Sequence, residues 1–455
     1  MNPRVRQWLA GSVRLRLRHA REYLTFDSRL FQRLTAAGTF ALSTLLLVLK
    51  QRYKAFALLS TVHRGNWSST ADRVVERCFQ SEIAHSKNTH LTNGILRHHI
   101  ASVQPSPSTQ AFFDDPDRLL GKRVLVLKSP RGAEKGVVLV DYSFAFPLVA
   151  KFFDLQRIAD RYHVVIEPSW SGYCDLDVLC YAAYDFPVFV EAFEPRDAET
   201  VRTMRANLIP VPTSTNWWVD HRVMRPLPGV KKDRDLVMIA SWAPFKRHAR
   251  FFAALSTLRR RGHRPTVSLL GYGTANELAN IVSEADHYGV RDQLEFFEWL
   301  QPEEVNYQLN RAKVNVIWSR KEGVNRAIIE GMFAGVPCIL REGFNYGYPY
   351  PYVNEQTGRF ANEETLPDVI LELLESSGRF APRDWVMSNM SCQRATEIIG
   401  SAVRDLAVSR GEAWTVDPVV KVCYLSDMRY WDESDRSKFE TDYGFLRSTH
   451  RSATG

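Results

Sequence analysis

The stretch KVNVIWSRKEGVNRAIIEGMFAGVPCIL, residues 313–340, decides the fold because short apolar runs flank a helix-compatible segment. VNVIWS (314–319) is an apolar, β-branched run typical of a buried strand. NRAIIEGMFAG (325–335) has its apolar residues at helical spacing, and PCILRE (337–342) reads as a second strand. Two strands joined through a helix predict a βαβ unit in a parallel sheet.

The same alternation continues on the amino-terminal side of this stretch. Apolar runs recur at 235–241, 265–273 and 293–299, with helix-compatible segments between them. An earlier series of runs ends before the Pro-rich stretch RPLPGVKKDRD (225–235). Strands that alternate with helices predict parallel sheets with right-handed crossovers. The earlier runs are RVLVL (123–127), GVVLVDY (136–142), YHVVIE (162–167), FPVFVE (186–191) and NLIPV (207–211).

Two such series predict two domains, and a chain of 455 residues is long enough to form them. We expect residues 120–228 and 229–400 to form two Rossmann-like α/β domains, each a doubly wound parallel sheet, with a ligand cleft between them. Residues 1–119 are expected to form a basic, mainly helical extension and linker. Residues 401–455 are expected to form a helical and irregular tail able to pack back on the N-terminal domain.

The net charge of +8 comes from the N-terminus. The first 54 residues contain eleven Lys or Arg and two acidic residues, Glu22 and Asp27, which leaves this segment at +9 and the other 401 residues at −1. Because the other 401 residues have no excess of basic over acidic residues, nucleic acid is not expected as a partner. A basic segment that includes an apolar stretch favours an anionic membrane surface as the partner of residues 1–54.

The apolar stretch LTAAGTFALSTLLLVL (34–49) is shorter than the ~20 residues that span a bilayer. We interpret it as an amphipathic segment that lies on a membrane face; a helix packed on the protein's own body is the alternative.

Six cysteines without a CxxC pair fit a reducing compartment. The expected location is the cytoplasm, with peripheral attachment to the inner face of a membrane.

Two strand-to-helix turns carry residue types that hold phosphate. The chain has neither a GxGxxG nor a GxxxxGK[ST] motif, so the usual dinucleotide and P-loop signatures are excluded. SWAPFKRHAR (241–250) places Lys246 and Arg247 at a helix start, and SRKEGVNRAIIE (319–330) contains a second such turn. Helix N-termini bind anions, and both turns follow predicted parallel strands, at the edge where such sheets bind ligands.

Residues 235–342 resemble the donor-binding domain of family-four retaining glycosyltransferases, which have GT-B architecture. The stretch quoted first carries the family's Glu-x7-Glu pattern as Glu322 and Glu330, followed by the small-residue turn AGVP. The resemblance implies a nucleotide-sugar donor, retention at the anomeric carbon and no cofactor. Its other motifs, in chain order, are WAPFKRH (242–248), LLGYG (269–273) and FFEWLQPEEV (296–305).

The roles implied by the resemblance fit the chemistry of the side chains. Glu322, in the turn, would accept hydrogen bonds from sugar hydroxyls, and Glu330, on the helix, from the ribose hydroxyls. Lys246 would neutralise a diphosphate whose charge grows as the glycosidic bond breaks. Glu322 and Lys246 are therefore the expected catalytic residues. The expected donor-binding residues are Lys246, Arg247, Gly271, Gly273, Glu322, Gly323, Val324, Asn325, Arg326 and Glu330.

Several of these residues have a structural alternative. An i,i+4 ion pair with Arg326 would account for Glu330. A strand-end turn would account for Gly271 and Gly273 in GYGT.

The chain departs from the family pattern at Ser241, where an arginine is common. A second phosphate-binding cation must then come from another position, and Arg247, Arg320 and Arg326 are the candidates.

No metal is expected. DxD triplets hold a divalent cation in glycosyltransferases of another fold, but their number here is near chance and two of them lie in turn-rich linkers. The triplets are Asp115/Asp117, Asp175/Asp177 and Asp233/Asp235.

Weaker candidates for the acceptor site lie after the earlier strands, and for each a structural role is the alternative. They are Asp141, Tyr142, Glu167, Trp170 and Asp175.

An aromatic run, GFNYGYPYPYVNEQ (343–356), follows the last predicted strand. Its Tyr346, Tyr348, Tyr350 and Tyr352 could stack on a sugar or a base, or pack on one another in an ordered loop.

These observations predict a metal-independent glycosyltransferase that moves a sugar to a hydroxyl acceptor, such as a glycan or lipid-linked glycan of polysaccharide biosynthesis. A non-catalytic membrane or nucleic-acid adaptor with a degenerate GT-B fold is one alternative, and the presence of Lys246, Glu322 and Glu330 argues against it. A GT-B nucleotide-sugar epimerase is another, and it would need acid and base pairs that the sequence does not reveal.

Overall fold

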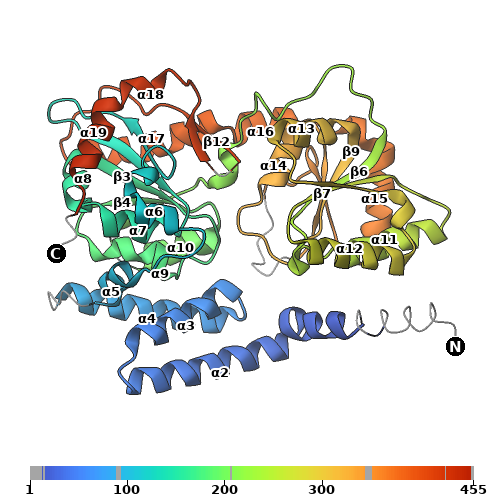
Figure 1. Ribbon diagram of the computed structural model, residues 1–455, viewed down its shortest axis with the longest axis horizontal. Coiled ribbons are helices and arrows are strands. Elements are labelled where there is room, and N and C mark those ends of the chain that lie inside the picture. Colours follow the sequence, from blue (N-terminus) through green and yellow to red (C-terminus); the bar gives the residue numbers. More distant parts are fainter. Residues whose placement is uncertain are drawn as a thin grey trace. The chain divides into compact units, whose positions relative to one another are not determined.

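The chain folds into two compact units (Figure 1). The computed structural model describes Val13 and residues 16–88, 94–204, 207–343, 351–425 and 427–451. Unit 1 consists of Met1–Gln32 and His221–Ser391, and unit 2 of Arg33–Asp220 and Cys392–Gly455. The chain thus changes unit after Gln32, Asp220 and Ser391, where the sequence predicted boundaries after residues 119, 228 and 400.

Unit 1 contains a six-stranded sheet in which all neighbouring strands run parallel. The order is β11-β10-β9-β6-β7-β8, so β9 and β6 lie side by side near the centre, with Leu236 opposite Val314. The stretch 313–340 supplies the βαβ unit that its sequence predicts. The strands are β6 (Arg234–Ile239), β7 (Val267–Gly271), β8 (Leu294–Glu298), β9 (Ala312–Ile317), β10 (Cys338–Arg341) and β11 (Gly358–Ala361).

Helices cover both faces of this sheet, as Figure 1 shows for α11 and α12 on one face and α13 and α14 on the other. Phe251, Phe252 and Ile281 of the first pair join the buried cluster beneath them, together with Ile370 of α15. The predicted Rossmann-like fold is confirmed for this unit. The helices are α11 (His248–Arg260), α12 (Ala275–Tyr288), α13 (Pro302–Arg311), α14 (Arg326–Phe333), α15 (Leu366–Ser376) and α16 (Pro382–Asn389).

Unit 2 contains a five-stranded sheet in the order β1-β2-β3-β4-β5. β2 to β5 are parallel, as predicted, but β1 pairs antiparallel with β2. The wholly parallel prediction is wrong here because a parallel crossover needs a dozen or more residues and the two strands are joined by a short turn. The strands are β1 (Val124–Lys128), β2 (Gly136–Asp141), β3 (Tyr162–Glu167), β4 (Val188–Glu191) and β5 (Leu208–Val211).

The rest of unit 2 is largely helical, and the predicted helical N-terminal region is confirmed. A hairpin of β12 (Lys421–Tyr424) and β13 (Asp427–Tyr430) interrupts the C-terminal segment, which the sequence predicted to be helical and irregular. The helices are α3 (Arg52–Gly65), α4 (Ser69–Asn88), α5 (Ile95–Ser102), α6 (Gln110–Asp114), α7 (Ala145–Phe152), α8 (Leu155–Arg161), α9 (Leu176–Leu179), α10 (Pro195–Thr203), α17 (Cys392–Ser409), α18 (Asp435–Lys438) and α19 (Glu440–Ser448).

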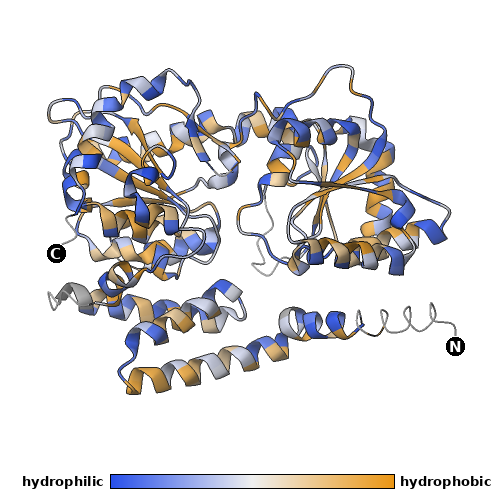
Figure 2. Ribbon diagram, in the orientation of Figure 1, coloured by the Kyte–Doolittle hydropathy of each residue, from blue (hydrophilic) through white to orange (hydrophobic). Residues whose placement is uncertain are grey.

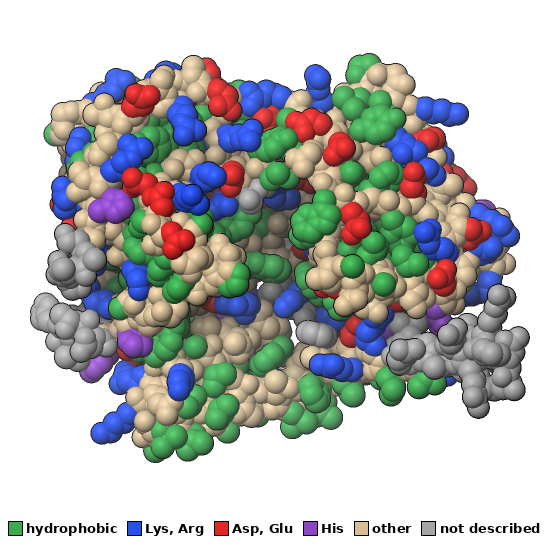
Figure 3. Space-filling model, in the orientation of Figure 1, with side chains coloured by type: hydrophobic (Ala, Val, Ile, Leu, Met, Phe, Trp, Pro, Cys, Tyr) green, Lys and Arg blue, Asp and Glu red, His purple; other side chains and the backbone are tan. Residues whose placement is uncertain are grey.

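Helix α2 (Arg29–Val48) is apolar and little buried. Among the described residues it is the one helix that is long and apolar enough to cross a membrane, by length and composition alone, and 11% of its most apolar stretch is buried. Figures 2 and 3 show apolar residues along this helix and hydrophobic side chains gathered over it. Its exposed residues include Leu30, Leu34, Leu42, Leu45 and Val48.

Helix α14 lies directly on β9 because residue 331 has no side chain. Asn315, buried on β9, donates a hydrogen bond from Nδ2 to the carbonyl oxygen of Ala327 at 2.9 Å. A Cβ added to Gly331 would lie 2.6 Å from that nitrogen. The small residue after Glu330 therefore sets the distance between helix and strand.

We predict that Gly331→Ala destabilises the protein by ~1–3 kcal/mol, because overpacking at Asn315 outweighs the gain of ~1 kcal/mol in helix propensity. Urea unfolding followed by tryptophan fluorescence measures the change. Gly444→Ala is the matched control, since it lies in α19 with no atom within 4 Å of an added Cβ, and it should stabilise by ~0.5–1 kcal/mol. Equal effects of the two substitutions would contradict the packing argument.

Candidate functional site

The loops that follow β6 and β9 meet at the carboxyl edge of the unit 1 sheet. The backbone N–H of Arg320 donates to the carbonyl oxygen of Phe245 at 2.7 Å. Lys246 ends the short 3-10 helix η5 (Pro244–Lys246), and its Nζ lies 2.7 Å from Oε1 of Glu322. The two side chains are only 14% and 7% exposed. The structure therefore joins the two expected catalytic residues in one largely buried ion pair.

The start of α14 is fixed by a side-chain cap. Asn325 Oδ1 accepts a hydrogen bond from the N–H of Ile328 at 3.1 Å, so Asn325 has a structural role. Gly323 and Val324 lie in the turn before the helix. Helix α14 begins at Arg326, so the backbone amides of its first turn face this end of the site.

Arg326 and Glu330 form the i,i+4 ion pair that the sequence analysis gave as the alternative for Glu330. Arg326 Nη2 lies 3.5 Å from Glu330 Oε1. Burial raises the pKa of Glu330, and the charge of Arg326 opposes that rise. At 3.5 Å this is a loose pair on a partly exposed helix face, worth only tenths of a kcal/mol, so it leaves the carboxylate able to exchange partners.

The two glycines of GYG make room for Trp242. A Cβ on Gly271 would lie 2.6 Å from the Trp242 ring and from the carbonyl oxygen of Ala240, and a Cβ on Gly273 would lie 3.1 Å from the same ring. Trp242 is fully buried, and its Nε1 donates to Glu298 at 2.8 Å. Close packing against Trp242 thus explains why positions 271 and 273 are both glycine.

An exposed aromatic pair lies beyond β7 and β8, and the sequence analysis missed it. The rings of Tyr272 and Trp299 are 5.4 Å apart, and the residues are 55% and 66% exposed. The N–H of Trp299 donates to the carbonyl oxygen of Gly271 at 3.1 Å, with Trp299 in the left-handed region at φ 56°. One aromatic residue directly after each of two neighbouring strands was the signal available in the sequence.

Two of the three candidate replacement cations are buried arginines in unit 1. Arg247 is in the left-handed region at φ 60°, and its Nη2 lies 2.7 Å from Glu363. Burial lowers the pKa of Arg247 to about 10. The Arg320 side chain is 2% exposed and lies 3.3 Å from Asp27. Both arginines therefore already have carboxylate partners.

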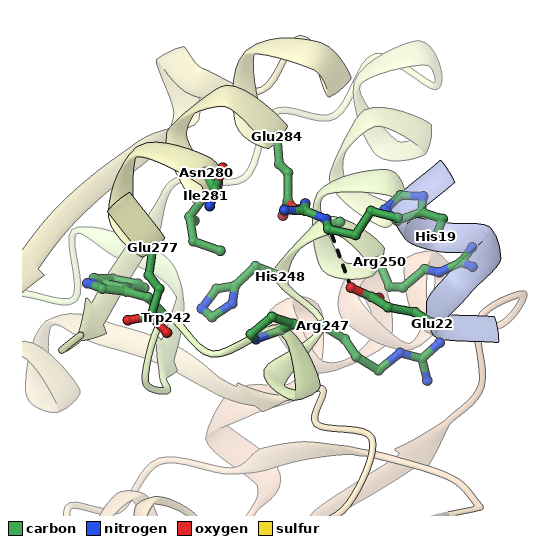
Figure 4. Close-up of a pocket in the computed structure, with 13 residues that line it drawn as sticks. His19, Glu22, Trp242, Arg247, His248, Arg250, Glu277, Asn280, Ile281 and Glu284 are labelled. Carbon is green, nitrogen blue, oxygen red and sulfur yellow. Dashed lines mark ion pairs between the residues drawn. The ribbon is translucent and has the colours of Figure 1, made fainter. Parts of the chain in front are cut away.

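A small pocket opens at the start of α11 (Figure 4). Its volume is about 40 Å³, and residues of the N-terminal segment form one of its walls. His248 points into it; burial lowers the pKa of this residue to about 3, so its ring is neutral at pH 7. The pocket is lined by Arg18, His19, Glu22, Trp242, Pro244, Arg247, His248, Ala249, Arg250, Glu277, Asn280, Ile281 and Glu284.

Three neighbouring strands of unit 2 each end in a carboxylate: Asp141 on β2, Glu167 on β3 and Glu191 on β4. Asp141 lies opposite Glu167 in the parallel register, and all three residues are at most 1% exposed. Burial raises the pKa of Asp141 and of Glu191 well above the usual range for carboxyl groups. Loss of hydration is the main cause of both shifts, and the charge of Glu167 raises the pKa of both groups further.

Two buried cations complete this cluster. Lys421 Nζ lies 2.5 Å from Glu167 Oε2 and 4.2 Å from the centre of the Trp218 ring. Arg123 Nη1 lies 3.2 Å from Asp141 Oδ2. The sequence analysis did not find Lys421, which lies in the C-terminal segment. The signal visible in the sequence was that all three strands end in an apolar residue followed by an acidic one, as VD, IE and VE.

The other acceptor candidates lie in the loops next to these strands. Tyr142 is in the left-handed region at φ 63°, with the Arg123 guanidinium 4.7 Å from its ring centre. Trp170 is 47% exposed. Asp175 caps α9 by accepting from the N–H of Asp177 at 2.9 Å and also pairs with Arg64. A structural role accounts for Asp175.

Each DxD triplet has protein partners. Asp117 bonds His450 at 2.7 Å, Asp177 bonds His99 at 2.7 Å, and Asp233 and Asp235 pair with Arg311 and Lys313. In the described part of the chain no group of His, Cys, Asp and Glu is arranged to hold a metal ion.

Of the aromatic run, Tyr346, Tyr348 and Tyr350 lie outside the described residues. Tyr352 is 1% exposed, which fits a ring packed in the protein and not a stacking surface.

Comparisons with known proteins agree with the resemblance at a coarse level. Residues 222–381 match the family model of group 1 glycosyl transferases, and this range falls within unit 1. The match supports glycosyl transfer as the activity of the family that residues 222–381 resemble. No curated protein matches the chain.

Solved glycosyltransferase structures share parts of the fold at low identity. Sucrose-phosphate synthase from Thermosynechococcus elongatus is 15% identical, with 60% of this chain and 73% of that chain covered and a TM-score of 0.46. α,α-Trehalose-6-phosphate synthase from Burkholderia multivorans is 12% identical, with 61% and 73% covered and a TM-score of 0.46. The C-terminal domain of a group 1 glycosyl transferase from Francisella tularensis is 17% identical, with 38% and 98% covered and a TM-score of 0.34. At this level of likeness we draw nothing from them about substrates.

We predict that Lys421→Met destabilises the protein by ~3–5 kcal/mol, because it leaves the Glu167 carboxylate buried without its cation. Urea unfolding at pH 7 measures the loss. The double variant Lys421→Met/Glu167→Gln should recover part of it, since the uncompensated charge is gone. Equal stability of the single and double variants would contradict this account.

Proposed function

We propose that the protein is a retaining glycosyltransferase of the family-four, Glu-x7-Glu type that transfers a sugar from a nucleotide-diphosphate sugar to a hydroxyl acceptor. The observation that carries the proposal is the ion pair of Lys246 and Glu322, at the carboxyl edge between neighbouring strands β6 and β9. The match to group 1 glycosyl transferases covers both residues.

The pair offers the two charges that a nucleotide sugar needs. In the proposed complex Lys246 turns from Glu322 to the diphosphate and stabilises its growing charge as the glycosidic bond breaks. Glu322 then accepts hydrogen bonds from sugar hydroxyls, and the amides of the α14 turn lie beside it. When the configuration at the anomeric carbon is retained, the departing phosphate lies on the same face as the incoming hydroxyl and can take its proton. No separate general base is then required.

The nucleoside part of the donor fits two features of unit 1. Glu330 exchanges its loose pair with Arg326 for the vicinal ribose hydroxyls, which suit a two-oxygen acceptor. The exposed rings of Tyr272 and Trp299 offer a surface on which the base stacks. No divalent cation is required in this arrangement, because lysine and arginine supply the positive charge.

We propose unit 2 as the acceptor unit, with Tyr142 and Trp170 as the residues that contact a glycan or lipid-linked glycan. Asp141 and Glu167 then act by holding this edge of the sheet rigid, because their carboxylates are buried in ion pairs with Arg123 and Lys421. Exposed aromatic side chains suit the apolar faces of sugar rings.

We further propose that residues 1–54 hold the enzyme on the inner face of a membrane as a peripheral protein. The exposed apolar side chains of α2 support this, since a helix packed on the protein's own body would bury them. The basic residues on either side would contact anionic headgroups.

We predict that a nucleotide or nucleotide sugar from a panel of uridine, guanosine and adenosine compounds raises the melting temperature of the parent protein. Glu330→Ala should abolish most of that shift, because the ribose hydroxyls lose their acceptor. Differential scanning fluorimetry measures both. Glu375→Ala, an exposed glutamate of α15, is the matched control and should respond like the parent.

The donor assignment would be wrong if no compound stabilised the parent. It would also be wrong if Glu330→Ala responded as the parent does.

We predict that replacing Leu42, Leu45 and Val48 together by Asn reduces binding to anionic vesicles at least tenfold, since each apolar side chain contributes on the order of 1 kcal/mol when buried in the headgroup region. Sedimentation with phosphatidylcholine vesicles containing phosphatidylserine measures binding at low and high salt. Val408→Asn, an equally exposed apolar residue on α17, is the control. Unchanged binding of the triple variant would refute membrane attachment through α2.

A further inference from the structure

The N-terminal segment carries acidic residues only where they face a buried arginine. Glu22 and Asp27 are the two acidic residues among the first 54, against eleven Lys or Arg. Both belong to unit 1, and both lie beside Arg320: its Nη2 is 3.3 Å from Asp27 and 3.9 Å from Glu22. Glu22 also lies 3.9 Å from Arg18 of the same segment, so Arg320 is the guanidinium that both carboxylates share.

The local fold of the segment explains how both carboxylates reach the same side chain. Tyr23–Asp27 forms a single π-helical turn, closed by the N–H of Ser28 donating to the carbonyl oxygen of Tyr23 at 2.8 Å. The wider turn of a π-helix brings residues five apart, here Glu22 and Asp27, to the same side. Arg18 holds the segment from its other end by pairing with Glu284 of α12.

Arg320 is one of three arginines that follow neighbouring strands. In the sheet order β10-β9-β6, Arg341 is the last residue of β10, Arg320 follows β9 and Arg247 follows β6. Their charges act on one another: after burial, the charge of Arg341 lowers the pKa of Arg247 most, while Glu363 and Asp27 raise it. Three guanidiniums therefore share one edge with the carboxylates of Glu22, Asp27 and Glu363.

We infer that Arg320, Arg247 and Arg341 form an anion-binding centre for the diphosphate of the donor, which the carboxylates of Glu22 and Asp27 occupy in the ligand-free protein. This inference rests on the proposed function, since it names the cations that replace the missing arginine at Ser241. Guanidinium binds phosphate and carboxylate oxygens with the same geometry, so one can replace the other. Phosphate then has to displace the N-terminal segment in order to bind.

The test compares anion binding by full-length variants. Isothermal titration calorimetry measures inorganic pyrophosphate and the nucleoside diphosphate selected by the melting panel. Asp27→Asn and Glu22→Gln should each tighten binding of both ligands, by roughly fivefold or more, because a competing carboxylate is removed. Asp27 is 22% exposed, so its substitution does not disturb a packed core.

Two further variants separate this effect from a general change of charge. Asp286→Asn removes an exposed carboxylate from α12 away from Arg320, and should leave both affinities unchanged. In the double variant Asp27→Asn/Arg320→Gln the gain should disappear, because the arginine that the anion would reach is gone. Hydrogen exchange of residues 16–28 should also speed up when the ligand is bound.

Tighter binding by Asp27→Asn that needs Arg320 supports the inference. If the nucleotide binds the parent and Glu330→Ala abolishes that binding, but Asp27→Asn leaves every affinity unchanged, the inference fails and the proposed function stands. If Asp27→Asn tightens pyrophosphate while no nucleotide binds any variant, the anion centre stands and the proposed donor function fails.

Discussion

The bond from Arg320 N–H to the Phe245 carbonyl oxygen, with the ion pair of Lys246 and Glu322 beside it, ties together the two loops on which the site depends. Strands β6 and β9 are neighbours, so their carboxyl ends bring these loops together without any long connection. A lysine and a glutamate held this way satisfy one another while the site is empty. In the proposed complex each takes one part of a nucleotide sugar, the lysine the diphosphate and the glutamate the hydroxyls.

The packing beneath these loops allows the pair to form. Gly331 lets α14 lie against Asn315, and Gly271 gives Trp242 its place under the β7 end. Both glycines permit a close approach of a buried side chain, which no larger residue would allow. The Glu-x7-Glu stretch is therefore held in place by the packing of Gly331 on Asn315, and Asn325 caps the helix start that lies between its two glutamates.

The sequence sufficed to predict five of the six parallel strands of unit 1, because each of these is an apolar run separated from the next by a helix. It did not predict β11 (Gly358–Ala361), which follows β10 without a helix among the described residues between them. It also indicated Lys246 and Glu322, since both lie in turns that follow predicted strands, while Glu330 came from the Glu-x7-Glu resemblance. The antiparallel β1 could have been foreseen from its short connection to β2. The pairing of Lys421 with Glu167, and of Asp27 with Arg320, could not, because each joins residues hundreds of positions apart whose contact only the folded chain creates.

The buried cations at the carboxyl edges of the two sheets have carboxylate partners that differ in exposure. That exposure affects which cations can exchange a carboxylate for a ligand. In unit 2 the pair of Lys421 and Glu167 is sealed, at 0% and 1% exposed, whereas Arg123 of the same cluster also pairs with Asp427, which is 43% exposed. Separating the sealed pair leaves a buried charge uncompensated, at a cost of several kcal/mol. In unit 1 the arginines are equally buried, but their carboxylate partners Glu363 and Asp27 are 43% and 22% exposed. Those carboxylates can return to water at a lower cost than the buried partner of Lys421, which supports the inference that an incoming anion takes their place at the unit 1 edge.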